Sequence, residues 1–261
     1  MGRVELNITG HMAHVAHVTL AHAGKFNAMS RNMWCELRSA FEAVQQDTTI
    51  RCVLIRGEGG HFCAGGDISE YAGFRFEEAL LRDFHEGDVW GGLQAMLDCD
   101  VPIVAQIEGN CMGAGLEIAS CCDLRLATFS ARFGAPIAKL GFPMAPREAA
   151  LVLSAVGELT AREMLLSASV LDAQEMKQRG FLNNVVPDTD IRLLVQNSVA
   201  RMGKLAPAAA RLNKQCFRAL RQQTHALVAT DLIANAYGYA NTDEHREGVQ
   251  AFVEKRSPNF L

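Results

Sequence analysis

The sequence predicts an α/β fold in which a layered, mostly parallel β-sheet core is followed by a helical C-terminal region. Three short apolar segments are typical of buried strands, and they read RCVLIRG, PIVAQIE and CDLRLAT. Helical patterns lie between them, and this β/α alternation favours parallel strands that are covered by helices. From about Leu151 the pattern becomes helical. We therefore expect a core over residues 1–190 and a helical region over residues 191–261.

The remaining elements follow from the spacing of apolar residues. Residues 3–9 and 12–20 alternate in polarity and are rich in Val, Ile and Thr, which predicts a hairpin that turns at Gly10 and His11. The segment NAMSRNMWCELRSAFEAVQQD places Met33, Leu37 and Phe41 at helical spacing. In the C-terminal half, helices are expected at 160–168, 171–179, 190–203, 206–222 and 226–240, with a last one after Thr242 or Asp243.

Composition excludes several classes of protein. The chain is 49% hydrophobic, enough for a sizeable core, and its net charge of −4 gives no reason to expect nucleic acid as a partner. No apolar run is long enough to span a membrane. The eight cysteines form no C-x-x-C pair, and the first ten residues lack the apolar region of a signal peptide. We expect a cytoplasmic protein that makes no contact with a membrane.

Metal and nucleotide chemistry find no support in the motifs. His14 and His17 stand three residues apart on a predicted strand, so their side chains face opposite sides. The segment GEGGHFCAGG contains neither a G-K-[ST] nor a G-x-G-x-x-G pattern. We therefore expect no metal site and no bound cofactor.

Two glycine-rich turns are the strongest functional signal. One follows RCVLIRG and contains Ala64-Gly65-Gly66, and the other follows PIVAQIEG and contains Gly113-Ala114-Gly115. Small residues let backbone N–H groups face a ligand, and a helix start adds unpaired N–H groups and a favourable dipole. Two such turns that converge on one point would stabilise an oxyanion.

Two residues near the second turn could act chemically. Glu117 has apolar neighbours in the sequence, so its carboxyl group is expected to point into the glycine-lined cleft. A partly desolvated carboxyl group there suits general acid–base catalysis. The alternative is a glutamate that only complements the helix dipole. Cys111, in a G-x-C-x-G pattern, could instead be the nucleophile of a cysteine hydrolase with His225 or His245 as its base.

The segments HFCAGGDI, IEGNCMGAGLEIASCCDLRLAT, ARFGAPIAKLGF and DEHREGVQAFVEKRSPNF closely resemble the enoyl-CoA hydratase/isomerase (crotonase) family, in order and spacing, from about Met12 to the C-terminus. The resemblance implies a crotonase-like spiral of ββα units with a C-terminal helical trimerisation region. It also implies acyl-CoA thioesters as substrates, coenzyme A as part of the substrate, no other cofactor, and a homotrimer or a hexamer built as a dimer of trimers.

Carried over position by position, the resemblance assigns roles to single residues. The two oxyanion N–H groups fall on Ala64 and Ala114, and the acid/base falls on Glu117. Asp67 is expected to make structural hydrogen bonds, and Lys25 and Lys255 are expected to contact coenzyme A. The other positions that the resemblance places at the substrate are Phe26, Ala28, Gly65, Gly66, Ile68, Met112, Gly113, Pro136, Ile137 and Leu140.

The chain departs from the family at one catalytic position. The second hydratase glutamate should follow the F-G-x-P motif, but here the sequence is FGAPIAK and Ile137 stands in its place. An isoleucine cannot orient water or move a proton. Glu148, near the start of the next predicted helix, could approach the pocket, or it could be an ordinary helix N-terminal glutamate behind Pro146. Tyr237 and Tyr239 could supply a phenol, although core packing is the expected role of both.

The resulting functional prediction is an enoyl-CoA hydratase-like lyase that lacks one of the two usual glutamates. Double-bond isomerisation is the alternative chemistry, because one carboxylate suffices for it. Decarboxylation, thioester hydrolysis and a non-catalytic acyl-CoA-binding protein remain further alternatives. The aromatic segment at 69–98 is either a helix packed on the core or the wall of the acyl pocket, and its fold should decide which acyl group fits.

Overall fold

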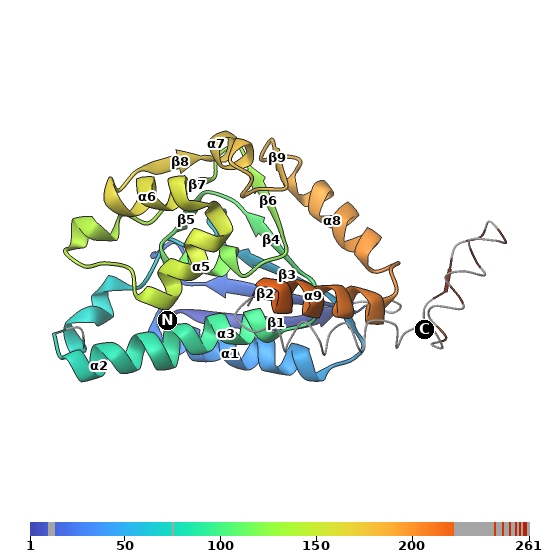
Figure 1. The fold of residues 1–261 in the computed structure, drawn as a ribbon, viewed down its shortest axis with the longest axis horizontal. Coiled ribbons are helices and arrows are strands. Elements are labelled where there is room, and N and C mark those ends of the chain that lie inside the picture. Colours follow the sequence, from blue (N-terminus) through green and yellow to red (C-terminus); the bar gives the residue numbers. More distant parts are fainter. Residues whose placement is uncertain are drawn as a thin grey trace.

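The main feature of the fold is a six-stranded sheet with the order β1-β2-β3-β4-β6-β9 (Figure 1). The computed structural model describes residues 1–9, 14–74 and 76–221, together with seven single positions between 243 and 259. In this sheet β1 runs antiparallel to β2, and the following strands pair in parallel. The strands are β1 (Arg3–Thr9), β2 (His14–Ala21), β3 (Ile50–Gly57), β4 (Ile103–Ile107), β6 (Leu124–Thr128) and β9 (Asn184–Val186).

A second, smaller sheet carries the segment that leads to the second glycine turn. Its strands are β5 (Asn110–Met112), β7 (Arg132–Gly134) and β8 (Val170–Asp172), in the order β5-β7-β8. An isolated parallel bridge joins Cys63 to Cys111, next to β5. The chain segments that follow β3 and β4 are thereby fixed side by side, as the two predicted turns require.

Alternate residues of β3 explain why helices cover both faces of the main sheet. Val53 and Ile55 belong to the cluster formed with α1 (Arg31–Gln46) and α3 (Trp90–Asp98). Cys52 and Leu54 belong to a second cluster, formed with α8 (Ile191–Met202). Successive side chains of a strand point to opposite faces, so an uninterrupted apolar strand needs a covering layer on each side.

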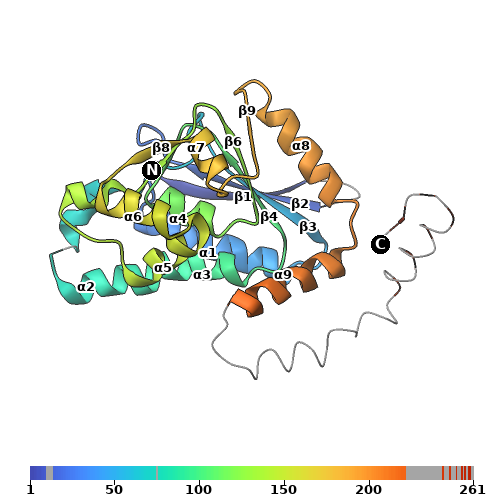
Figure 2. The same cartoon turned by 45° about the horizontal axis from the view of Figure 1, so that its top comes forward.

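The helix α1 forms where the sequence predicts it. Ser30 caps its N-terminus by accepting a hydrogen bond from the N–H of Met33, and its buried side chains follow the predicted spacing. Between β3 and α3 lie η1 (Ile68–Gly73), α2 (Glu78–Asp83) and the π-helix η2 (Phe84–Val89). In both views α2 and α3 follow one another beside α1 (Figure 2).

Short helices complete the region around the second turn. They are α4 (Ala114–Ser120), η3 (Pro136–Leu140), α5 (Pro146–Val156), α6 (Glu158–Leu166) and α7 (Ala173–Gln178). The predicted helix at 171–179 is wrong in its first part, where β8 (Val170–Asp172) pairs with β7. Asp172 ends this strand and caps α7 in a reciprocal capping box with Glu175, so helix begins only after it.

The C-terminal region begins with helices that pack on the core. α8 covers the sheet itself, and α9 (Pro207–Arg221) is fixed by its basic side chains: Arg218 binds Asp100 at 2.7 Å and Lys214 binds Asp123 at 2.8 Å. The division at residue 190 stays a prediction, and the helix expected at 226–240 lies outside the described residues. Within the described ranges, no helix has both the length and the apolar character needed to cross a bilayer.

Candidate active site

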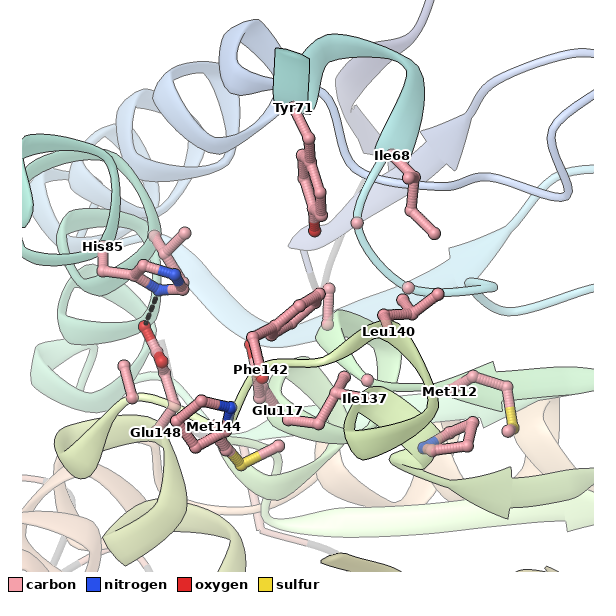
Figure 3. A pocket seen from close by; sticks show the side chains of 18 of the residues that line it. Ile68, Tyr71, His85, Met112, Glu117, Ile137, Leu140, Phe142, Met144 and Glu148 are labelled. Atoms are coloured by element: carbon pink, nitrogen blue, oxygen red, sulfur yellow. Dashed lines mark hydrogen bonds and ion pairs between the residues drawn. The ribbon is translucent and has the colours of Figure 1, made fainter. Parts of the chain in front are cut away.

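A cavity of about 330 Å³ lies where the two glycine turns meet the helical segments (Figure 3). One side, here called the turn wall, consists of residues 64–66 and 112–114 with Glu117. The other side, called the helix wall, consists of Phe84, His85 and Val89 from η2, together with Met144, Ala145 and Glu148 at the start of α5. The two walls therefore come from different layers of the fold.

The two glycine turns converge as the sequence predicts. A β-carbon added at Gly113 would lie 3.6 Å from the Cα of Gly65, and one added at Gly65 would lie 3.6 Å from the carbonyl oxygen of Met112. Both glycines have positive φ angles, +117° at Gly65 and +47° at Gly113, which side-chain-bearing residues rarely adopt. Glycine at these positions thus allows the sharp turns that bring the two backbones together.

The structure corrects the predicted donor at Ala64. Its N–H donates to the carbonyl of Phe26 at 3.0 Å, so this group is already used. Met29 pairs with the turn by donating to the carbonyl of Gly65 and by accepting from the N–H of Asp67. The N–H of Gly66, which lies between these two bonded residues, donates to no other described residue, and Gly66 lines the cavity.

The second predicted donor, Ala114, lies at the start of a helix. Ala114 is the first residue of α4, after the N-cap Gly113, and the N–H groups of a first helical turn have no partner inside the helix. Ala114 lines the cavity, and its N–H makes no hydrogen bond to another described residue. Gly66 and Ala114 thus supply one unpaired N–H each, from two turns in contact.

Glu117 is a buried carboxyl group at the turn wall. It lies in the first turn of α4 and is only 8% exposed. Burial, and then the negative charge of Glu148, raises the pKa of Glu117 to about 8. No described residue donates a hydrogen bond to this carboxyl group. Glu117 therefore lies one helical turn after the N–H of Ala114, in surroundings that favour the protonated form of its carboxyl group.

Glu148 brings a second carboxyl group to the same cavity. It lies in the first turn of α5, behind Pro146, and is 2% exposed. Its Oε1 atom is 3.1 Å from Nδ1 of His85, as the dashed line in Figure 3 shows. The sequence left open whether Glu148 approaches the pocket, and the structure places it there with its side chain buried against η2.

Ile137 occupies the position at which the family pattern has its second glutamate. It lies in η3 and lines the cavity. In the view of Figure 3, Ile137 and Glu148 are on opposite sides of Glu117. The cavity thus has an apolar side chain at residue 137 and a carboxyl group at residue 148, on different sides of Glu117.

Most of the substrate-binding positions predicted from the resemblance line this cavity. The exceptions are Lys25, Phe26, Ala28 and Asp67, which lie beside the first turn rather than in the cavity, and Lys255, which lies outside the described residues. Tyr237, Tyr239, His225 and His245 also lie outside the described residues. The predicted positions that line the cavity are Ala64, Gly65, Gly66, Ile68, Met112, Gly113, Ala114, Glu117, Pro136, Ile137, Leu140 and Glu148.

Asp67 has the structural role expected of it. Its carboxylate caps η1 by accepting from the N–H and Oγ of Ser69, and it forms an ion pair with Lys25 at 2.6 Å. Burial alone would raise the pKa of Asp67, but the hydrogen bonds from Lys25 and Ser69 hold that pKa below its ordinary value. These contacts fix the exit of the first turn and hold the Lys25 ammonium group beside it.

The nucleophile alternative at Cys111 is wrong. Its side chain is fully buried, and burial raises the pKa of the thiol well above its ordinary value. Cys111 lies in β5, where it pairs with Cys63 and packs in the main hydrophobic cluster. A buried, protonated thiol with this packing is a small core residue and not a reactive group.

Sequence reasoning missed many of the residues that line the cavity. The segment at 69–98 does form part of the pocket wall, but through Tyr71, Phe84, His85 and Val89, whereas Phe74 is buried beside Phe84 and Phe76 is exposed. No motif marks His85, because the π-helix that carries it has no sequence signature in this chain. The other lining residues that were not predicted are Trp34, Lys139, Phe142, Pro143, Met144 and Ala145.

The fold and the site define a class of protein: an α/β spiral in which paired turns present N–H groups next to a buried acid. The sequence model described as enoyl-CoA hydratase/isomerase matches residues 10–261. The chain belongs to this family.

Named relatives and solved structures cover nearly the whole chain. A 2,3-dehydroadipyl-CoA hydratase of Escherichia coli is 31% identical over 257 residues, 97% of each protein. A crotonyl-CoA hydratase of Syntrophomonas wolfei is 31% identical over 90% of each. The crystal structure of an enoyl-CoA hydratase/carnithine racemase from Magnetospirillum magneticum has a TM-score of 0.93 at 32% identity and covers 98% of this chain and 95% of its own.

Proposed function

We propose that this protein catalyses the reversible addition of water to a 2-enoyl-CoA thioester, with Glu117 as the acid and Glu148 as the base. One observation carries the proposal: two buried carboxyl groups share a cavity with two N–H groups that have no hydrogen-bond partner among the described residues. Burial and the charge of Glu148 raise the pKa of Glu117, which favours its use as the acid. The named activities of the Escherichia coli and Syntrophomonas wolfei relatives support the same reaction class.

The N–H groups of Gly66 and Ala114 would bind the thioester carbonyl oxygen. When a nucleophile adds to C3 of the enoyl group, negative charge moves to this oxygen and an enolate forms. Two preorganised donors stabilise that charge more strongly than the neutral carbonyl, and each is typically worth about 3–4 kcal/mol in the transition state. Stabilisation of the negative charge on this oxygen requires only backbone N–H groups.

The two carboxyl groups would move the protons. The Glu148 carboxylate takes a proton from water as its oxygen bonds to C3, and Glu117 gives its proton to C2 of the enolate. The product is a 3-hydroxyacyl-CoA, with the proton now on Glu148 and the charge on Glu117. Because the charge of each group acts on the other, return of the proton from Glu148 to Glu117 restores the starting state.

Double-bond migration is the second candidate reaction. The observation that favours it is Ile137, which makes the cavity more apolar at a position where the family pattern has a carboxylate. A single acid/base can remove a proton from C2 of a 3-enoyl-CoA, which gives a dienolate, and return that proton to C4, which gives the 2-enoyl-CoA. Isomerisation would then require Glu117 or Glu148 but not both.

The remaining family properties belong to the same proposal. An acyl-CoA substrate would place its coenzyme A portion near Lys25 and, from another part of the chain, near Lys255. We further propose a trimer or hexamer in the cytoplasm, with no cofactor other than the coenzyme A of the substrate.

The test is turnover of crotonyl-CoA and of a 3-enoyl-CoA, with products separated by chromatography. For hydration, the variants Glu117→Gln and Glu148→Gln should each lower kcat by about 10²–10⁴-fold. Glu158→Gln, on the exposed start of α6 and paired with Arg162, is the matched control and should keep wild-type kcat. Full hydration by Glu148→Gln would refute the assigned base, and isomerisation without hydration would select the second candidate.

A further inference from the structure

The π-helix η2 (Phe84–Val89) is an irregularity in the helical segment that runs from α2 to α3. π-Helical turns are rare, and they frequently occur at functional sites because they change the direction of side chains. Here Phe84, His85 and Val89 all line the cavity. This local geometry therefore presents an imidazole ring to a wall that is otherwise largely apolar on this side.

His85 makes the one hydrogen bond that the described residues provide to the Glu148 carboxyl group. The Nδ1 to Oε1 distance is 3.1 Å, and the side chains are 21% and 3% exposed. An ionised carboxylate can only accept hydrogen bonds, so Nδ1 carries the hydrogen whenever Glu148 is charged. A buried carboxylate with a single donor depends on that donor for its orientation.

The other charged groups of η2 are paired away from Glu148. Glu86 pairs with Arg147 of α5 at 3.2 Å, and Asp88 accepts a hydrogen bond from Nε of Arg31 on α1 at 2.6 Å. Arg31 also pairs with Asp83, at the end of α2. These pairs tie η2 to α1 and α5. Glu117 on α4 also lines the cavity, and its charge interacts with that of Glu148. Lys139 brings a cationic side chain to the same cavity.

We propose that His85 is a positioning residue whose Nδ1 hydrogen bond holds the Glu148 carboxylate toward the reacting atoms. The inference rests on the proposed function of Glu148 and extends it to the residue that orients this carboxylate for the reaction. The second carboxyl group of this cavity comes from residue 148 and not from residue 137. In this position it requires a hydrogen-bond donor on the facing helix, η2.

Substitutions at His85 can separate the hydrogen bond from the packing. His85→Phe keeps a planar ring but removes the donor, whereas His85→Asn places an amide N–H near the position of Nδ1. We expect His85→Phe to lower kcat by about 10- to 100-fold with little change in KM, because a misdirected base loses its reaction geometry. His85→Asn should recover a large part of kcat. Glu86→Gln, on the same π-helix, is the matched control and should keep wild-type kcat.

A readout that does not depend on activity completes the test. The ¹⁵N NMR spectrum of the His85 ring should show a hydrogen-bonded Nδ1–H in the wild type, and this hydrogen bond should be lost in Glu148→Leu, which has no acceptor. If Glu148→Gln is inactive but His85→Phe keeps the wild-type kcat, the role of His85 is refuted and the proposed function stands. If the wild type turns over no enoyl-CoA, the proposed function fails, and the ring spectra alone decide whether His85 holds Glu148.

Discussion

The two walls of the cavity differ in what builds them. The turn wall is made of backbone: its N–H groups at Gly66 and Ala114 are fixed by two glycine turns that lie in contact. The helix wall is made of side chains, Glu148 and His85, which depend on one another for orientation. Backbone donors are set by the fold, whereas the direction of the Glu148 carboxyl group depends on the side chain of His85. The turn wall is therefore sensitive to changes of the backbone, and the helix wall to changes of single side chains.

The largest expected effect concerns the turn wall. Ala114→Pro removes one N–H at the first position of α4, where proline is otherwise well tolerated. Loss of one oxyanion donor should lower kcat by about 10²–10³-fold. Ala114→Gly keeps the N–H and is the matched control, with activity near wild type. Equal activity of the proline and glycine variants, measured on the same enoyl-CoA, would show that the N–H of Ala114 takes no part in the reaction.

An intermediate effect concerns stability at the junction of the two walls. The pKa of Glu117 is about 8 in the folded protein and 4.5 ordinarily, so between these values the unfolded chain releases a proton that the folded protein keeps. The free energy of unfolding therefore falls as the pH rises through this window. Glu117→Gln removes that loss and should raise Tm by about 5 °C at pH 8, with a smaller gain at pH 5.

Thermal unfolding at pH 5, 6.5 and 8 measures this difference directly. Glu158→Gln, an exposed glutamate that is paired with Arg162, should show no such pH dependence of its Tm difference. A gain in Glu117→Gln that is the same at all three pH values would mean that Glu117 is ionised in the folded protein.

The smallest expected effect concerns the support beneath the turns. Cys111→Ala removes a buried sulfur atom from β5 and should lower the free energy of unfolding by about 1 kcal/mol. The kcat should stay at the wild-type value, and iodoacetamide should not inactivate the native enzyme. Chemical denaturation and the enoyl-CoA assay measure the two quantities. A large loss of kcat in this variant would show that the Cys111 thiol takes part in the reaction.

The turn wall could be predicted from the sequence to a greater extent than the helix wall. Apolar strands that end in glycines, followed by a helix with Glu117, are local patterns, and the structure confirms the two turns. The error at Ala64 came from transferring a position without its hydrogen bonds, because only the contact with Phe26 reveals that this N–H is used. Sequence alone does not place His85 beside Glu148, since they are 63 positions apart and meet through a π-helix.

The most direct test is the titration of the Glu117 carboxyl group by ¹³C NMR, in the wild-type protein and in Glu148→Gln. If the two carboxyl groups share one cavity as the structure indicates, Glu117 titrates near pH 8 in the wild type, and the removal of the Glu148 charge lowers this value. The carboxyl group of Glu117 stays buried in the variant, so its pKa should remain above the ordinary value of 4.5. Titration near 4.5 in both proteins, or an unchanged value in Glu148→Gln, would contradict a coupled pair of carboxyl groups at this site.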